Sequence, residues 1–126
     1  MTAVSIGVGC RKGCGADAIE ALVRQALGDA TLSTPVGLFT LIDKQGEAGL
    51  AEAADRLGLR VTYLSREALR DRAGDTRTQS PNAEKQFGVP SVAEASALAG
   101  AGPQSVLIVP RIARDGATCA IARSAA

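Results

Sequence analysis

Short apolar runs alternate along the first half of the chain with segments in which apolar residues recur at helical spacing. The runs near residues 3–8, 36–42 and 61–64 predict strands, because they are short and rich in β-branched residues. Between them, residues 16–27 and 47–57 predict amphipathic helices, each followed by a glycine suited to a helix C-terminus. This alternation of strands and helices predicts parallel pairing through right-handed crossovers.

The next part of the chain is less regular. Ser65 is placed to begin a short helix, and residues 73–81 form a long polar loop without periodicity. Asn82 is expected to cap a following helical turn. Ser91 and Glu94 then form a capping box ahead of an alanine-rich helix.

Two further apolar runs, residues 105–109 and 118–122, flank an Asp115-Gly116 pair and predict a β-hairpin. The order of elements predicts a three-layer α/β fold whose central sheet of about five strands is mostly parallel and ends in an antiparallel C-terminal hairpin. At this length we expect residues 1–126 to form a single domain.

Composition limits which side chains can fill the core and which classes of partner the protein can bind. Hydrophobic residues make up 46% of the 126-residue chain, yet it has two Phe, one Tyr and no Trp. Small aliphatic side chains must fill the interior, which favours helices and strands that approach each other closely. The net charge of +1 and the dispersed basic residues do not suit nucleic acid. No apolar stretch approaches the ~18 residues of a membrane span, so no membrane partner is expected.

Histidine is absent, which excludes Ser-His-Asp and Cys-His catalysis and histidine metal sites. Cys10, Cys14 and Cys119 do not have zinc-site spacing, so we expect no metal and no cofactor. The odd number of cysteines, and the arrival of Lys12 soon after the first apolar run, predict a cytoplasmic location. Cys10 either fills a crowded turn or, beside Arg11 and a helix N-terminus, has a lowered pKa and is reactive.

A glycine-rich loop follows the first strand and is the strongest local signal of a site. Freed backbone amides at a helix N-terminus bind anions, and Arg11 and Lys12 add two positive charges. We therefore predict that these two side chains and the amides near Gly9 and Gly13 hold an anionic ligand. The alternative is a tight turn with solvated basic residues. The glycine spacing departs from the dinucleotide pattern G-x-G-x-x-G, so the nucleotide signal is weak.

Asp43, Lys44 and Glu47 follow the second predicted strand, near the same sheet edge. Lys44 and Glu47 suit binding of a carboxylated ligand or proton transfer, with Glu47 as general base and Lys44 as charge stabiliser. Spacing alone favours a structural role, in which Asp43 caps the helix and the other two residues form an exposed pair at its start. Arg77, in the polar loop, and Arg111, after the fourth strand, are further cationic candidates.

Four segments carry a resemblance to a known family. They are Val4–Gly13; Leu41–Lys44 with Glu47 and Gly49-Leu50; Gly88–Ala95; and the ending from Val109–Arg111 through Thr118–Arg123. In this order, over about residues 3–123, they resemble the CobE and CbiG C-terminal domain family of cobalamin biosynthesis. The resemblance implies an α/β domain that acts on corrinoid or precorrin intermediates, which are large rings bearing many carboxylates. In fused members of the family it implies hydrolysis of a δ-lactone on a cobalt-precorrin, with loss of acetaldehyde. In free-standing members it implies the aerobic route, which supplies a metal-free substrate.

These observations lead us to expect a cobalamin biosynthesis protein that binds a polycarboxylate corrinoid intermediate as a carrier or accessory protein. Other enzymes of the pathway are candidate partners, and the oligomeric state stays open. A precorrin-modifying enzyme, resembling the lactone hydrolase, is the alternative, and a small nucleotide-binding module ranks third. The candidate catalytic residues are Lys44 and Glu47; the candidate ligand-binding residues are Gly9, Cys10, Arg11, Lys12, Gly13, Asp43, Arg77, Ser91 and Arg111.

Overall fold

The computed structural model describes residues 2–30 and 33–125 and contains one five-stranded sheet of order β3-β2-β1-β5-β4. Strands β3, β2 and β1 pair in parallel, whereas β5 is antiparallel to both β1 and β4. Four strands therefore point one way, which confirms the predicted α/β sheet with an antiparallel C-terminal hairpin. The strands are β1 (Thr2–Cys10), β2 (Ser33–Leu41), β3 (Val61–Leu64), β4 (Val106–Arg114) and β5 (Ala117–Arg123).

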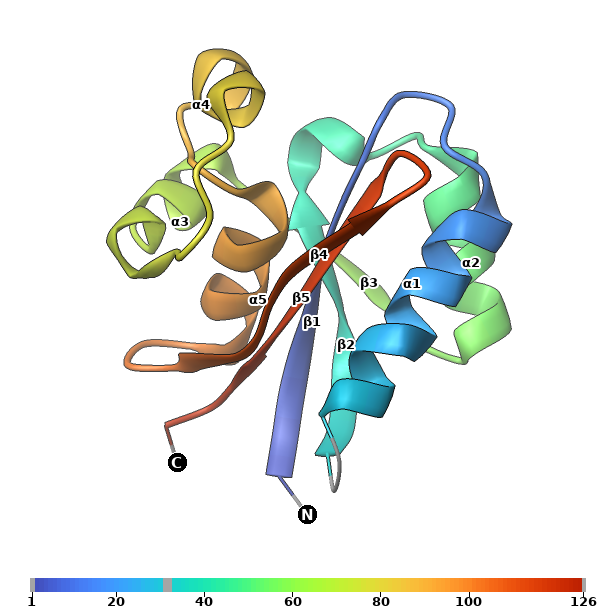
Figure 1. Cartoon of the computed structure of the whole chain (residues 1–126), viewed down its shortest axis with the longest axis horizontal. Coiled ribbons are helices and arrows are strands. Elements are labelled where there is room, and N and C mark those ends of the chain that lie inside the picture. Colours follow the sequence, from blue (N-terminus) through green and yellow to red (C-terminus); the bar gives the residue numbers. More distant parts are fainter. Residues whose placement is uncertain (1, 31–32, 126) are drawn as a thin grey trace.

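Helices cover both faces of the sheet and give three layers (Figure 1). On one face lie α1 (Ala16–Asp29) and α2 (Ala48–Leu57). On the other face lies α5 (Val92–Ala101), with the shorter helices α3 (Arg66–Arg70) and α4 (Pro81–Phe87) farther from the sheet. Single 3₁₀ turns, η1 (Ile42–Lys44) and η2 (Ala73–Asp75), follow β2 and α3. No helix among residues 2–30 and 33–125 is both long and apolar enough to cross a membrane.

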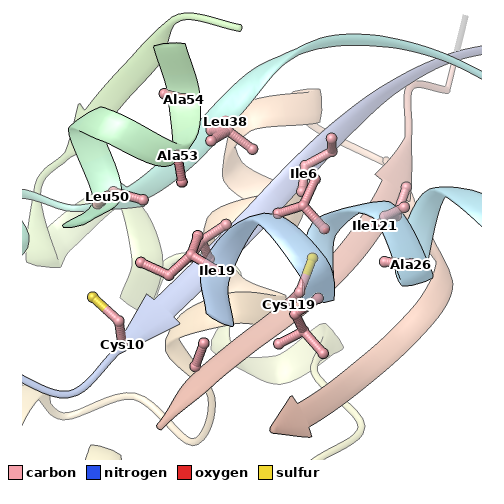
Figure 2. Packing of buried hydrophobic residues seen from close by; sticks show 14 of the residues in the cluster. Ile6, Cys10, Ile19, Ala26, Leu38, Leu50, Ala53, Ala54, Cys119 and Ile121 are labelled. Atoms are coloured by element: carbon pink, nitrogen blue, oxygen red, sulfur yellow. The ribbon is translucent and has the colours of Figure 1, made fainter. Parts of the chain in front are cut away.

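The α1–α2 face holds the larger of the buried clusters (Figure 2). Ile6 of β1 and Leu38 of β2 pair in register and are fully buried beside Ile19 of α1 and Leu50 of α2. Every second residue of β1, from Val4 to Cys10, belongs to this cluster. The alternation along the strand therefore directs its branched side chains to one helical layer.

The opposite face is packed much more closely. Gly7 of β1 lies against the backbone of α5 at Ala93 and Ala97, where no β-carbon would fit. Helix α5 is buried from Val92 to Leu98, because the sheet covers one side of it, at Ala93 and Ala97, and Leu69 of α3 packs on another. Small residues on both partners permit this approach, which is how a core with few aromatic side chains is filled.

Several local boundaries differ from the sequence prediction. Gly28 lies inside α1 without a left-handed backbone, and Ala30 is the C-cap. Ser80, not Asn82, caps α4: its hydroxyl accepts a hydrogen bond from the Ala83 amide at 3.3 Å. The cap precedes Pro81 because proline is favoured at the first helical position, where its fixed φ already suits the helix.

Candidate functional site

A cleft of about 710 Å³ opens at the carboxyl end of β1, between α4 and the β4–β5 hairpin. In Figure 1 these elements surround the upper end of the sheet. Parallel strands present their carboxyl ends at one edge, where α/β folds bind ligands. Seven of the predicted site residues line the cleft: Gly9, Cys10, Arg11, Lys12, Lys44, Ser91 and Arg111.

The structure completes the cleft with two walls, in which the sequence had predicted only Ser91 and Arg111 as site residues. One is formed by the α4 segment and the start of α5, and the other by the hairpin. The α4 sequence predicts only a helical turn, because its position over the sheet edge depends on tertiary contacts. The added lining residues are Ser80, Asn82, Ala83, Gln86, Phe87, Val92, Ala113, Arg114, Asp115, Gly116, Ala117 and Thr118.

Charge is distributed very unevenly over this lining. Among the described residues that line it, the basic side chains are Arg11, Lys12, Lys44, Arg111 and Arg114, and the single acidic side chain is Asp115. Lys44 and Arg111 are half-buried, whereas the other basic residues are exposed. A concave surface lined by one sign of charge raises the local concentration of oppositely charged ligands. The cleft therefore favours an anion with several negative groups.

Glu47 and Gly13 lie outside the lining and contact each other. The Gly13 amide, predicted to hold a ligand anion, donates a hydrogen bond to Glu47 Oε1 at 2.8 Å. Glu47 is the N-cap residue of α2, so its carboxylate ties the glycine-rich loop to that helix. The Arg11 amide is also engaged, by the carbonyl oxygen of Gly116 in the hairpin at 2.9 Å. The loop is thus held by its own chain on two sides.

Asp43 also has a partner within the chain. Its carboxylate accepts hydrogen bonds from the Arg66 guanidinium at 2.5 and 3.2 Å, which lower the pKa of Asp43. Arg66 and Lys44 lie 5.5 and 5.2 Å from the centre of the Phe87 ring. Both distances are within the range of cation–π attraction. Lys44 is therefore held against the α4 wall of the cleft, while Asp43 lies outside the lining.

Cys10 is not an activated thiol. It is only 8% exposed, and its burial raises the pKa from 9.0 to about 11, despite the nearby positive charge of Lys44. The option of a reactive cysteine with a lowered pKa was therefore wrong, because loss of hydration outweighs the nearby positive charge. Within the described residues, no group of three or more Cys, Asp or Glu side chains is placed to hold a metal ion.

The N-terminus of α5 contains a polar arrangement that the capping-box pattern revealed only in part. Ser91 caps the helix by accepting a hydrogen bond from the Glu94 amide at 3.2 Å. The Glu94 side chain does not complete the box. Instead, it accepts hydrogen bonds from the backbone amides of Arg77 and Thr78, each at 2.8 Å, and from that of Arg111 at 2.9 Å. The Arg77 side chain is exposed and outside the lining.

A comparison with known protein families agrees with this architecture. The family profile described as "Cobalamin synthesis G C-terminus" matches residues 4–122, which include all five strands apart from their outermost residues. The chain belongs to this family. It is therefore a cobalamin biosynthesis protein related to CobE and CbiG.

Individual relatives support the assignment. Protein CobE of Sinorhizobium sp is 30% identical over 119 residues, covering 93% of this chain and 77% of the relative. The crystal structure of CobE, a protein from the cobalamin (vitamin B12) biosynthetic pathway, is similar with a TM-score of 0.89 at 33% identity, covering 97% of this chain and 90% of that one. The cobalamin biosynthesis protein chiG from Agrobacterium tumefaciens str. C58 gives 0.76 at 37% identity, covering 98% and 99%.

A more distant solved structure shares only the fold. A putative cobalamin biosynthesis protein G homolog from Sulfolobus solfataricus has a TM-score of 0.62 at 21% identity. The match covers 97% of this chain but 37% of that protein. The same fold thus forms part of a longer chain in that protein.

Proposed function

We propose that the cleft binds a corrinoid or precorrin intermediate through its peripheral carboxylates, and that the protein acts as a carrier or accessory protein in cobalamin biosynthesis. The observation that carries the proposal is the excess of basic over acidic side chains around the cleft, five against one. Charge-assisted hydrogen bonds from Arg and Lys are strong and suit carboxylates. A ring bearing many carboxylates is the ligand chemistry in cobalamin biosynthesis that fits such a lining.

The size and the second wall of the cleft also suit a macrocycle. A volume of about 710 Å³ lies in the upper part of the range found for small-molecule binding sites. The α4 wall contributes uncharged groups, among them Asn82, Gln86 and the Phe87 ring. The carboxylates of a corrinoid would meet the basic wall, while its less polar ring face would meet α4.

The geometry favours binding over proton transfer. The candidate base Glu47 is occupied by the Gly13 amide and does not line the cleft. The acidic residue that does line it, Asp115, is exposed at the tip of the hairpin. A general base must reach the proton that it removes, at hydrogen-bond distance or through one water. We therefore place Lys44 among the binding residues and Glu47 among the residues that hold the loop.

The test is a visible-absorption titration of the protein with hydrogenobyrinic acid. We expect a saturable, stoichiometric spectral shift, with affinity reduced about tenfold in Arg11→Ala and in Lys44→Ala, since each variant removes one ionic contact. Arg24→Ala is the matched control, because Arg24 pairs with Glu20 on the exposed face of α1. Glu47→Gln should keep most of the affinity.

Two other results would contradict the proposal. Absence of any spectral shift would show that this protein does not bind the corrinoid. A new product spectrum that is lost in Glu47→Gln would replace the carrier function by the alternative, a precorrin-modifying enzyme.

A further inference from the structure

Glu94 is a fully buried charged residue whose carboxylate contacts two separate segments. Its side chain has no solvent exposure. Oε1 accepts from the Arg77 and Thr78 amides at 2.8 Å each, and Oε2 accepts from the Thr78 hydroxyl at 3.0 Å and the Arg111 amide at 2.9 Å. A buried carboxylate is tolerated only when such donors replace its lost hydration. The four hydrogen bonds therefore need both segments to stay in place.

One segment is an irregular point in β4. Val109 pairs with Ile121 and Ile112 with Cys119, so three steps along β4 match two along β5. Pro110 has no amide hydrogen, and the Arg111 amide points away from the ladder toward Glu94. An extra residue in one strand redirects the side chains around it, and such irregularities occur often next to binding sites. Glu94 thus fixes the point at which the Arg111 side chain enters the cleft.

The other segment leads into the opposite wall. Thr78 is two residues before Ser80, which lines the cleft and caps α4. The Ser80 amide also donates to the Pro90 carbonyl oxygen at 2.8 Å, which closes the loop around α4. The position of α4 therefore depends on the same carboxylate that holds the Arg111 amide.

We propose that Glu94 is a positioning residue for the cleft: its carboxylate fastens the α4 wall and the Arg111 wall to α5 and so sets the distance between them. This inference rests on the proposed function only for its ligand. Glu94 does not meet the ligand itself, because it is buried beneath the lining. It acts through Arg111 and through the α4 segment.

The first test needs no ligand. Amide hydrogen exchange is measured on the wild type and on Glu94→Gln, which keeps the size of the side chain but replaces one acceptor oxygen by a donor. We expect exchange to increase about tenfold or more at Arg77, Thr78 and Arg111, because their shared acceptor is weakened locally. Exchange at Ile6, in the centre of the sheet, should stay unchanged. Unchanged exchange at all three amides would overturn the inference.

The second test is a double-mutant cycle in the titration with hydrogenobyrinic acid. Glu94→Gln and Arg111→Ala should each weaken binding about tenfold, and the double variant should lose far less than the product of the two, because one residue acts through the other. Combined with Arg11→Ala, the loss from Glu94→Gln should instead multiply to about a hundredfold. Equal multiplication with both partners would show that Glu94 does not act through Arg111, which would overturn the proposal that it fastens both walls.

Thr78→Val keeps the inference testable if Glu94→Gln does not fold. This change removes one of the four hydrogen bonds and leaves the carboxylate and the three amides in place. We expect faster exchange at Thr78 and about threefold weaker binding, in line with the loss of one hydrogen bond. Wild-type exchange and wild-type affinity in this variant would contradict the inference. If the wild type itself does not bind the pigment, the proposed function fails, and hydrogen exchange alone decides the role of Glu94.

Discussion

Gly7 of β1 lies directly beneath Ala93 of α5, and a β-carbon built on the glycine would overlap the Ala93 carbonyl oxygen. The same β-carbon would lie 2.5 Å from the main-chain nitrogen of Ala97. Strand and helix thus contact each other through their backbones over this turn. The obstacle is main chain on both sides, so it cannot be relieved by a change of rotamer.

We predict that Gly7→Ala lowers the free energy of unfolding by about 3 kcal/mol, at the upper end of the usual cost of overpacking. Urea denaturation followed by circular dichroism measures this directly. Gly28→Ala is the matched control, because a β-carbon at Gly28 meets nothing within 4 Å and the residue lies inside α1. That change should raise stability by about 0.5–1 kcal/mol. Equal stability of the two variants would contradict the close packing of β1 on α5.

Stability at acid pH should depend on Glu94. Burial raises the pKa of Glu94, but the hydrogen bonds from Arg111, Thr78 and Arg77 lower it by more, so the folded value lies below the ordinary 4.5. A carboxyl group with a lowered folded pKa stabilises the protein above its unfolded pKa. This contribution is lost as the pH falls below about 4.5 and through the folded pKa.

The measurement is the difference in unfolding free energy between the wild type and Glu94→Gln as a function of pH. We expect about 2–3 kcal/mol at neutral pH, from hydrogen bonds to a buried charge. The difference should decrease in acid, where both proteins carry an uncharged side chain at this position. Asp43, which pairs with Arg66, is present in both proteins, so its pH-dependent contribution cancels in the difference. A difference that does not change with pH would show that the charge of Glu94 is not what stabilises the fold.

Cys10 should react slowly despite its position in the cleft. With a pKa of about 11 instead of 9.0, its thiolate fraction at pH 8 is about 100-fold smaller than that of an ordinary thiol. Iodoacetamide labelling followed by peptide mass spectrometry should therefore modify Cys10 at least about 100-fold more slowly in the native protein than in urea. Cys119, whose burial raises its pKa to about 12, should behave in the same way. Rapid native labelling of Cys10 would contradict the burial described here.

The fold was predictable because its signals are local. Ser65 and Ser91 cap helices where expected, Gly58 ends α2 with a left-handed backbone, and Asp115-Gly116 forms the hairpin turn. Each of these residues acts on neighbours within four positions along the chain. The extent of β4 was not predictable in this way. A proline normally marks the end of a strand, because it has no amide hydrogen for the ladder. Here β4 continues past Pro110, since the pairing with β5 is irregular at this point and requires no hydrogen bond from it.

The candidate site was predictable mainly where it coincides with strand ends; beyond them, Ser91 and Arg111 were the predicted residues that line the cleft. Arg11, Lys12 and Lys44 follow β1 and β2, so topology alone brings them to one edge. The role of Glu94 depends instead on three segments meeting in space, and its sequence context indicates only a helix cap. The Gly13 amide was predicted to hold a ligand anion, but in the structure it donates its hydrogen bond to the Glu47 carboxylate of the same chain.

Strand β4 forms one border of the sheet, where strands of other molecules can attach through free backbone groups. Its pairing with β5 is irregular between Leu107 and Val109 and again between Val109 and Ile112. Pro110 cannot donate a hydrogen bond, and the Arg111 amide is already engaged by Glu94. An incoming strand would therefore find few successive partners along this border. The irregularity that directs Arg111 into the cleft also protects the protein against aggregation through its edge strand.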